Sequence, residues 1–264
     1  MISCILKISN YDKNKEEGKC MKVTYGIQDV LVKIIRLLAE AGMWLDGVLY
    51  KVLYFVEWKF PGGRPPLSFD HDIELMYMWN KGEIGWLERA EMNLFCIQKF
   101  EKPLVIELGC ADGFYAFKFY SVVPDSKVIA CDKDRKTIKR GAIKHNRDNI
   151  TYKCLDFLHC MPHVEGVTNV IWDASINFFK RKEQEKILME IKDMLSKRGG
   201  ILSGCAVIEK GEAKWRYYDS LFYSTNEIEV LLKNFFLSVY VFESADKSGM
   251  IYFWATDGEL PFSA

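Results

Sequence analysis

The stretch VIELGCADGFY, residues 105–115, decides the fold. A run of apolar residues ends at Glu107 and Leu108, glycines follow at positions 109 and 113, and aromatic residues come next. This order predicts a buried strand, a tight turn and the first turn of a helix. Glycine suits such a turn because it adopts backbone angles that other residues avoid and lets a ligand approach the main chain. The free amides at the start of the helix can receive a polar or anionic group.

The spacing of the two glycines indicates which ligand the turn receives. A nicotinamide-binding turn reads GxGxxG, whereas here Ala111 lies between Gly109 and Gly113. An acidic residue, Glu107, precedes them at the tip of the strand and would repel a pyrophosphate. It suits a ligand that carries positive charge. S-adenosylmethionine is such a ligand, because it has an ammonium, a sulfonium and no phosphate.

Three further predicted strands also end in a carboxylate. Asp132 follows Glu107 at a spacing close to the roughly twenty residues that precede the ribose-binding acid of a doubly wound fold. Asp156 and Asp173 end the third and fourth strands. We expect Asp132 to accept hydrogen bonds from the ribose, and Asp156 to accept one from the adenine amino group while the Phe157 amide meets the ring. The carboxyl ends of parallel strands meet at one edge, where open α/β sheets bind their ligands.

Short β-rich runs alternate with helical stretches from the first strand onward, which predicts parallel strands joined by helical crossovers on both faces of a sheet. Only ADKSG separates the last two runs, so these are expected to pair antiparallel. The predicted fold class is α/β: a Rossmann-like, doubly wound, seven-stranded sheet of five parallel strands plus a C-terminal antiparallel hairpin, with an N-terminal helical extension. The predicted strands cover residues 104–108, 127–132, 150–155, 169–173, 200–208, 237–244 and 250–256.

The chain before the first strand has a different pattern. Apolar residues recur every three and four positions over 27–41 and again over 48–56, which predicts two amphipathic helices. PGGRPP at residues 61–66 then ends the helical pattern. The two helices either pack on the main domain or contact a membrane surface, and both interpretations stay open. The predicted parts are a helical extension over 1–60, a linker with cap helices over 61–102 and the α/β domain over 103–264.

The composition is that of an ordinary globular protein. The 264 residues carry 36 Lys and Arg against 36 Asp and Glu, and 49% are hydrophobic. A net charge of zero supplies no bulk attraction for a phosphate backbone, so nucleic-acid binding is not expected. The longest uncharged stretch is too short to span a bilayer. The eight cysteines include no CxxC pair, which predicts a cytoplasmic protein without a structural metal.

The strand ends carry ELGCADG, CDKD, CLDF and IWDASI, which resemble the motifs of a class I S-adenosylmethionine-dependent methyltransferase. Ala111 stands where that family carries its middle glycine. The stretches FDHDIELMYMW, GWLER and YVFES are similar to a group of bacterial methyltransferases of poorly defined acceptor. The resemblance implies that residues 103–256 bind the donor, with the methionine part at Glu107 and Gly109. The other donor-binding residues that it implies are Ala111, Gly113, Asp132, Lys133, Asp156 and Phe157.

Methyl transfer is an in-line displacement, so the protein need only align acceptor and methyl group, exclude water and, for a hydroxyl acceptor, remove a proton. Asp173 stands where amino-group methyltransferases carry Asn/Asp-Pro-Pro-Tyr. The sequence there is Asp-Ala-Ser-Ile, which argues against a nucleobase or amide nitrogen as acceptor. We expect Asp173 to contact the donor or the acceptor; the alternative is that it only caps the segment that follows.

Two residues outside the strands are further candidates. His71 lies between two aspartates that would strengthen it as a catalytic base, and the alternative is that its neighbours cap a helix. Arg89 would bind the donor carboxylate, or pair with Glu88 or Glu91 at the surface. After Ile208 the chain reads Glu-Lys-Gly-Glu rather than the acidic-amide pair of a magnesium site, so no metal is expected.

The sequence therefore predicts an S-adenosylmethionine-dependent methyltransferase (EC 2.1.1 class) with His71 and Asp173 as catalytic candidates. Its predicted acceptor is a hydroxyl of a small molecule or saccharide, and its product S-adenosylhomocysteine. Two alternatives stay open: an aminopropyltransferase-like enzyme, and a non-catalytic binding protein that keeps the fold. Peripheral contact is the only membrane association that these features allow.

Overall fold

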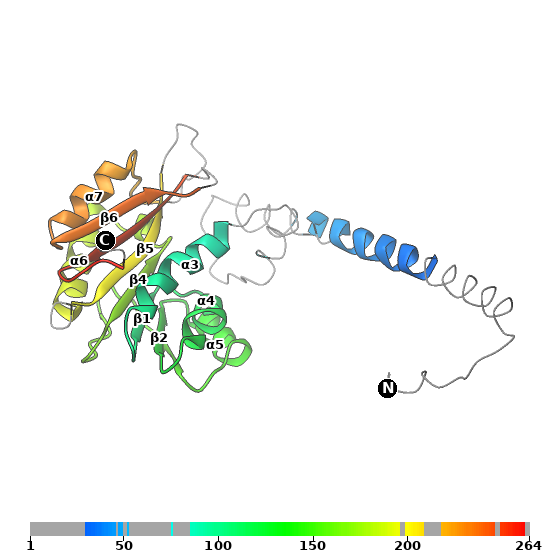
Figure 1. Ribbon diagram of the computed structural model, residues 1–264, viewed down its shortest axis with the longest axis horizontal. Coiled ribbons are helices and arrows are strands. Elements are labelled where there is room, and N and C mark those ends of the chain that lie inside the picture. The colour runs from blue at the N-terminus through cyan, green and yellow to red at the C-terminus, as the bar shows by residue number, and fades with distance from the viewer. Residues whose placement is uncertain are drawn as a thin grey trace, which may run out of the picture. The chain divides into compact units, whose positions relative to one another are not determined.

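The computed structural model divides into two compact units, residues 1–52 and 53–264 (Figure 1). The first contributes one described helix, and the second contains the sheet and the candidate site. The residues that the structure describes are 30–45, 47–49, 52, 75, 85–195, 199–208, 218–245 and 249–261.

The helix of the first unit covers residues 30–45 and continues through 47–49. Over 30–45 its charged residues are Lys33, Arg36 and Glu40, which share one face because they are three and four positions apart. The helix predicted from residue 27 is thus present from residue 30, whereas most of the second predicted helix lies outside the described residues. Every helix in the described part of the chain is too short or too polar to cross a bilayer.

Seven strands form one mixed sheet in the second unit, in the order β3-β2-β1-β4-β5-β7-β6 (Figure 1). The first five strands in this order pair in parallel, and β7 runs antiparallel to both β5 and β6. The predicted fold class and the antiparallel pairing of the last two strands are confirmed. The position of β7 between β5 and β6 was not predicted. The strands are β1 (Leu104–Leu108), β2 (Lys127–Asp132), β3 (Ile150–Cys154), β4 (Asn169–Asp173), β5 (Ile201–Val207), β6 (Ser238–Glu243) and β7 (Met250–Thr256).

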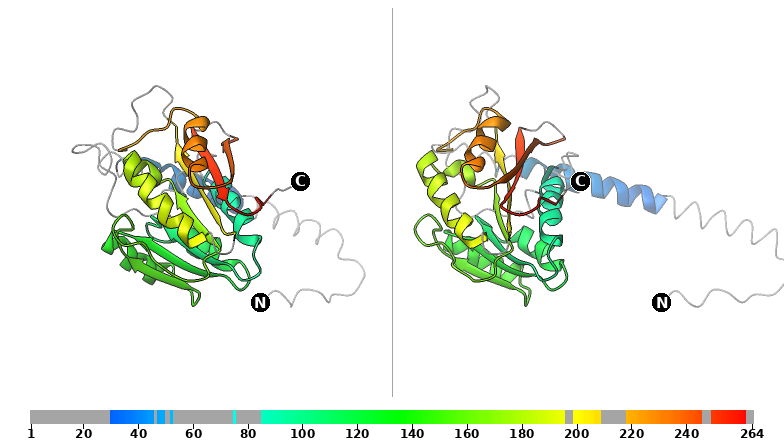
Figure 2. Two further views of the ribbon diagram at one scale, coloured as in Figure 1. Left: turned by 90° about the vertical axis from the view of Figure 1, so that its left-hand side faces the viewer. Right: turned by 60° about the vertical axis from the view of Figure 1, so that its left-hand side comes forward.

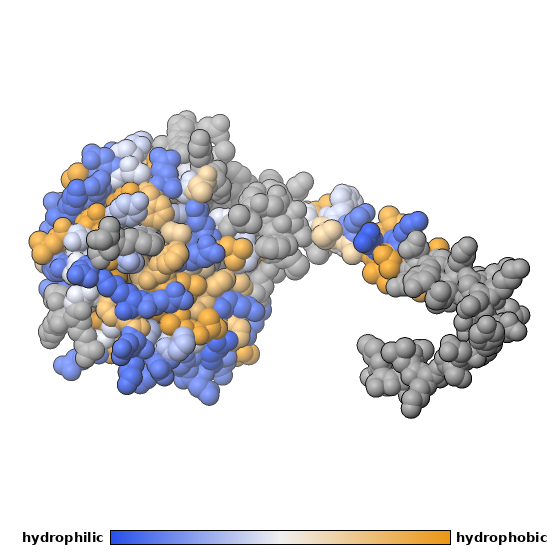
Figure 3. Space-filling view, viewed as in Figure 1, coloured by the Kyte–Doolittle hydropathy of each residue, from blue (hydrophilic) through white to orange (hydrophobic). Residues whose placement is uncertain are grey.

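Helices cover both faces of this sheet (Figures 1 and 2). Buried residues of α3, α4 and α5 share one hydrophobic core with β1, β2 and β4, and those of α6 and α7 share another with the opposite face. Hydrophilic residues are interspersed with hydrophobic ones over the face of this unit that Figure 3 shows. The helices are α3 (Gly85–Gln98), α4 (Phe114–Lys118), α5 (Arg135–Lys144), α6 (Arg181–Leu195) and α7 (Thr225–Lys233), with short 3-10 turns η2 (Tyr120–Val122) and η3 (Ile176–Phe178).

Strand alternation assigns each residue of the sheet to one of these two faces. In β1, Val105 belongs to the core under α3, α4 and α5, whereas Ile106 and Leu108 belong to the opposite core. Glu107 has the same parity as Val105, so its carboxylate lies on the α3 face. Asp173 has the parity of Ile171, which belongs to the same core. Alternation alone therefore brings two carboxylates to one face at the carboxyl ends of neighbouring strands.

Helix α3 is fastened to the sheet by hydrogen bonds from buried side chains. Asn169 Nδ2 of β4 donates to the carbonyl of Cys96 at 2.9 Å. Trp254 Nε1 of β7 donates to the carbonyl of Met92 at 3.1 Å. Both acceptors lie in the second half of α3, and Cys96 is in its last turn, where carbonyls lack partners inside the helix. These bonds fix the helix across β4, β5 and β7.

We expect Asn169→Ala to lower the free energy of unfolding by about 1–3 kcal/mol, because the variant leaves the buried carbonyl of Cys96 without its donor. Urea denaturation of the full chain measures this. Asn146→Ala is the matched control at an exposed position, and we expect it to stay within about 0.5 kcal/mol of the parent. Equal losses in the two variants would contradict the anchoring role of Asn169.

Candidate active site

The loop after β1 folds tightly against the end of β2. The amides of Gly109 and Cys110 both donate to the carbonyl of Cys131, at 2.8 and 2.9 Å, and the amide of Gly113 donates to Cys110 at 2.9 Å. Gly109 and Gly113 have φ angles of 75° and 71°, and Ala111 has a φ of 49°. The loop thus takes the left-handed conformation three times within five residues, and the residue that departs from the family's glycine pattern keeps this geometry.

Space as well as backbone angle requires the two glycines. A Cβ at Gly109 would lie 2.6 Å from Ser175 Oγ, and a Cβ at Gly113 would lie 2.5 Å from Tyr152 Oη. Neither distance is compatible with an ordinary side-chain contact. The loop is therefore pressed against β3 on one side and against the segment after β4 on the other.

Asp132, at the tip of β2, joins two loops of the carboxyl edge. Its Oδ2 accepts the amide of Ala111 at 3.0 Å, and its Oδ1 accepts the amide of Asp134 at 2.8 Å. Burial raises the pKa of this carboxyl, and the two amide hydrogen bonds oppose that rise. Each carboxylate oxygen can accept a second hydrogen bond. Asp132 can therefore bind ligand hydroxyls while it holds the glycine loop. Its neighbour Lys133 is exposed.

Glu107 is a buried carboxylic acid on the α3 face of β1. It is 3% exposed, and its Oε2 has no hydrogen-bond partner among the described residues. Burial raises its pKa, the carboxylate of Asp173 adds to the rise, and the guanidinium of Arg89 opposes it. A buried acceptor without a donor is costly, so this oxygen marks a place where a ligand can supply one.

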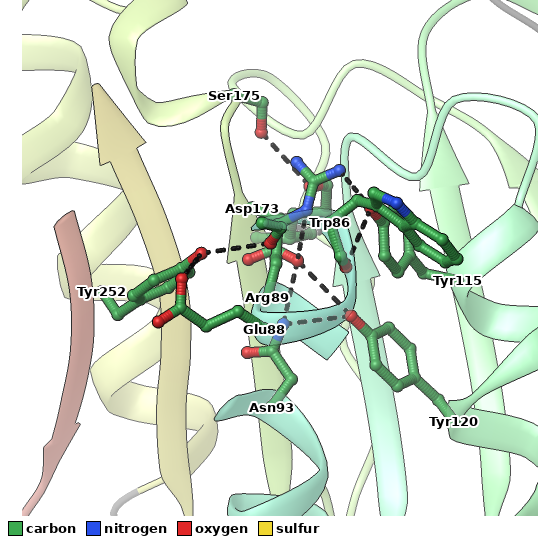
Figure 4. A network of polar contacts seen from close by, with 11 residues as sticks. Trp86, Glu88, Arg89, Asn93, Tyr115, Tyr120, Asp173, Ser175 and Tyr252 are labelled. Atoms are coloured by element: carbon green, nitrogen blue, oxygen red, sulfur yellow. Dashed lines mark hydrogen bonds and ion pairs between the residues drawn. The ribbon is translucent and has the colours of Figure 1, made fainter. Parts of the chain in front are cut away.

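Asp173, at the tip of β4, is a second carboxyl on the same face, and its side chain is 9% exposed (Figure 4). Its Oδ2 accepts Asn93 Nδ2 at 2.9 Å and the hydroxyl of Tyr120 at 3.4 Å, and it lies 3.9 Å from Arg89 Nε. Its Oδ1 is buried and has no hydrogen-bond partner within the described part of the chain. Burial raises the pKa of Asp173 to about 6, and Arg89 with the hydrogen bonds opposes the rise.

Arg89 projects from the first half of α3 toward this cluster rather than toward the surface (Figure 4). Its Nη2 donates to Tyr115 Oη at 2.5 Å, and its guanidinium carbon lies 4.4 Å from the centre of the Tyr115 ring. Glu88 instead accepts hydrogen bonds from Tyr252 Oη at 3.2 Å and from the amide of Ala245 at 3.0 Å. Arg89 therefore lies against Tyr115 and Asp173, contrary to the alternative of a surface ion pair with Glu88 or Glu91.

The segment after β3 is organised by its own residues. Asp156 accepts the amide of Leu158 with one oxygen and lies 3.1 Å from His159 Nδ1 with the other. The side chain of Phe157 is buried against Trp172 and belongs to the core under α6 and α7. The Phe157 side chain therefore belongs to the core, and the sequence argument assigned the backbone amide of this residue, not its side chain, to the adenine ring.

The structure brings together the predicted residues Glu107, Gly109, Asp132, Asp173 and Arg89 at one edge of the sheet. His71 lies outside the described residues, so its catalytic role stays a prediction. Within the described residues no group of His, Cys, Asp and Glu side chains could hold a metal ion.

Two residues of the cluster, Asn93 and Tyr120, were not predicted. Asn93 follows Arg89 by four positions on α3, so both lie on one helix face, a spacing that could have found it. Tyr120 lies in an aromatic run with no distinguishing signal.

Residues 105–199 match a family model described as a methyltransferase domain. The S-adenosylmethionine-dependent methyltransferase SibL, in its apo form, is similar with a TM-score of 0.59 and 12% identity, over 83% of this chain and 74% of that one. The N-methyltransferase NodS from Bradyrhizobium japonicum is similar with a TM-score of 0.52 and 14% identity, over 67% and 97% of the two chains.

A further similar structure is human N-acetylserotonin methyltransferase in complex with S-adenosylmethionine. Its TM-score is 0.52 at 15% identity, over 72% of this chain and 57% of that one. At such identities the likeness concerns the fold alone. The search of curated proteins finds no match.

We expect Gly113→Ala to lower the free energy of unfolding by about 1–3 kcal/mol, because its φ of 71° and the nearby Tyr152 ring both disfavour a side chain. Ala111→Gly is the matched variant in the same loop. Relief of its left-handed strain and the added freedom of the unfolded chain oppose each other, so we expect a change within about 1 kcal/mol. Urea denaturation compares the two, and a smaller loss in Gly113→Ala than in Ala111→Gly would contradict the steric argument.

Proposed function

Since this chain carries a methyltransferase domain on the class I, S-adenosylmethionine-dependent fold, we propose that it binds S-adenosylmethionine and transfers the methyl group to an acceptor hydroxyl. The observation that carries the proposal is the pair of buried carboxyl groups without full hydrogen bonding at the carboxyl edge of β1 and β4. When bound, the donor supplies an electrophilic methyl group on a sulfonium.

The methionine end of the donor fits the charges of this cluster. Glu107 Oε2 and Asp173 Oδ1 are buried acceptors without donors among the described residues, which suits an ammonium and a sulfonium. Arg89 is a cation beside Asp173 and suits the donor carboxylate, as a guanidinium binds carboxylates well. The glycine loop allows the ligand to approach the main chain next to these groups.

The nucleoside end fits the next two strand tips. Asp132 retains acceptor capacity for the ribose hydroxyls after binding two backbone amides. Asp156 and the backbone of Phe157 are assigned to the adenine, with Ala111, Gly113 and Lys133 completing the loops around the nucleoside. This assignment keeps every predicted donor-binding residue at the edge where ligands of open α/β sheets lie.

The acceptor is proposed to be a hydroxyl of a small molecule or saccharide. The segment Asp-Ala-Ser-Ile at the end of β4 lacks the prolines and the aromatic residue of amino-group methyltransferases. A carboxyl with a pKa of about 6 is a suitable base for a hydroxyl proton near neutral pH. In this assignment the acceptor oxygen bonds to the methyl carbon as the carbon–sulfur bond breaks, and the acceptor proton passes to Asp173.

The other sequence predictions stay proposals. We assign His71 as a second candidate base, the cytoplasm as location, and peripheral membrane contact as the role of the first unit if it is not a packing element. An aminopropyltransferase-like reaction would need the decarboxylated donor, which offers Arg89 no carboxylate. A non-catalytic binding protein would bind the donor and release no S-adenosylhomocysteine.

We expect isothermal titration calorimetry of the full chain to show binding of S-adenosylmethionine and S-adenosylhomocysteine. Asp132→Ala should weaken both affinities about tenfold to a hundredfold, because it removes hydrogen bonds between the ligand and a charged group. Asp148→Ala removes an exposed carboxylate at the amino end of β3 and should change neither affinity. Asp132→Asn keeps the shape of the side chain and separates loss of charge from loss of the loop contact. Equal affinity in Asp132→Ala and the parent would refute the nucleoside assignment.

We also expect release of S-adenosylhomocysteine when the protein is supplied with the methyl donor and hydroxylated small molecules or saccharides, with a methyl ether as the second product. Mass spectrometry identifies that product. Asp173→Asn cannot take up the acceptor proton, so its turnover should fall at least a hundredfold. An N-methylated product from amine acceptors, with none from hydroxyl acceptors, would contradict the proposed acceptor class.

A further inference from the structure

Two side chains donate hydrogen bonds to the same oxygen of Asp173. Its Oδ2 accepts from Asn93 Nδ2 at 2.9 Å and from Tyr120 Oη at 3.4 Å, and the same amide nitrogen donates to Tyr120 Oη at 3.0 Å. The three groups form a closed ring, in which Asn93 donates twice and Tyr120 both accepts and donates (Figure 4). Asn93 is 1% exposed and Tyr120 is 0% exposed. This ring fixes the plane of the carboxylate and leaves Oδ1 outside it.

We propose that Asn93 and Tyr120 are positioning residues of the active site. Their hydrogen bonds to Oδ2 stabilise the ionised carboxylate of Asp173 and direct its Oδ1 toward the cationic end of the donor. The inference rests on the proposed function, because it takes S-adenosylmethionine as the ligand. Two uncharged residues then decide the pH range in which the donor binds.

The alternative to an active-site role is that Asn93 only holds α3 on the sheet. That role is already filled by two other buried bonds, which Trp254 and Asn169 donate to the carbonyls of Met92 and Cys96 on either side of Asn93. These bonds hold the main chain of α3, whereas the Asn93 amide, among the described residues, donates to Tyr120 and Asp173 at the carboxyl edge. Its contacts are therefore in excess of what the attachment of the helix needs.

Titratable and charged side chains surround Asp173 on several elements. Burial raises the pKa of Tyr115, Tyr120 and Cys205, so these groups stay protonated near neutral pH. The pKa of Glu107 is also raised, so Glu107 is the member of this set that can titrate together with Asp173. The set consists of Arg89 on α3, Tyr115 on α4, Tyr120 on η2, Glu107 on β1 and Cys205 on β5.

The charge of Asp173 gives donor binding a pH dependence of definite sign. An ionised carboxylate attracts a cationic ligand and a protonated one does not. Because the pKa of Asp173 is raised to about 6, affinity for the donor falls as the pH drops through that value. Below the midpoint each bound donor releases one proton, so the affinity changes by up to about tenfold per pH unit. Loss of a hydrogen bond to Oδ2 disfavours the carboxylate and moves the midpoint to higher pH.

The test is the affinity of the full chain for S-adenosylmethionine, measured by calorimetry between pH 5 and pH 8.5. For the parent we expect affinity to rise with pH and to level off above about pH 6 to 7. Tyr120→Phe removes one hydroxyl and should move the midpoint upward by about one pH unit, while the affinity at pH 8.5 stays within about threefold. Asn93→Leu should give the same shift.

Three control variants define the cause of any shift. Tyr240→Phe makes the same chemical change at an edge-strand residue that is 51% exposed, and its midpoint should equal that of the parent. Asp173→Asn should abolish the pH dependence near pH 6. In the Glu107→Gln background, Tyr120→Phe should still move the midpoint of the pH dependence upward. If Asn93→Leu fails to fold, Tyr120→Phe carries the test, together with an NMR titration of the Asp173 carboxyl carbon in the free protein.

The outcomes separate this inference from the function that it builds on. An upward shift in Tyr120→Phe, absent in Tyr240→Phe, supports the positioning role. An equal loss of affinity at every pH, or an unshifted midpoint, overturns it and leaves a structural role for the ring. A parent-like pH curve in Asp173→Asn also overturns it, because another group would then be titrating. Absence of any donor binding by the parent refutes the proposed function itself.

Discussion

Two carboxyl groups, Glu107 and Asp173, lie largely out of water on one face of neighbouring strands at the carboxyl edge of the sheet, and the cation Arg89 accompanies them. A charge removed from water is stable only with partners, and each of these acids has an oxygen without one among the described residues. The protein holds this arrangement with α3, whose backbone is bonded to β4 and β7. Helix α3 thus contributes to the core and also contacts the charged groups through Arg89 and Asn93. The chemistry proposed for the site depends on the position of this helix.

The parity of the strands explains why the charges meet at all. On the α3 face of β1 and β4 the middle positions are the apolar residues Val105 and Ile171, and toward the carboxyl ends the same face receives Glu107 and Asp173. The opposite face keeps its apolar residues, Leu108 and Trp172, up to the same edge. At its carboxyl end the sheet therefore has one apolar face and one polar face. The polar side is the one against which the glycine loop and α3 are placed.

Much of this arrangement could be predicted from the sequence. The glycine spacing, the acidic strand tips and the alternation of strands and helices depend on local pattern, and these predictions agree with the observed sheet. The insertion of β7 between β5 and β6 could not be predicted, because a hairpin of the same sequence can pair at either edge with either strand inward. Asn93 was missed for a different reason, since its importance comes from a contact with Asp173, 80 positions away in the chain. Local periodicity places Asn93 on the same helix face as Arg89, but it carries no information about which strand end that face meets.

Ala111 shows how a departure from a family pattern can leave the geometry unchanged. Its φ of 49° is a conformation that costs a non-glycine residue about 1–2 kcal/mol. The cost is offset by the hydrogen bond from its amide to Asp132, which the same conformation directs at the carboxylate. The side chain therefore strains the loop, while the backbone does what glycine would do there. It follows that the glycine loop is defined by its backbone contacts with the tip of β2, and that Asp132 has a structural role in the loop besides the ligand role proposed for it.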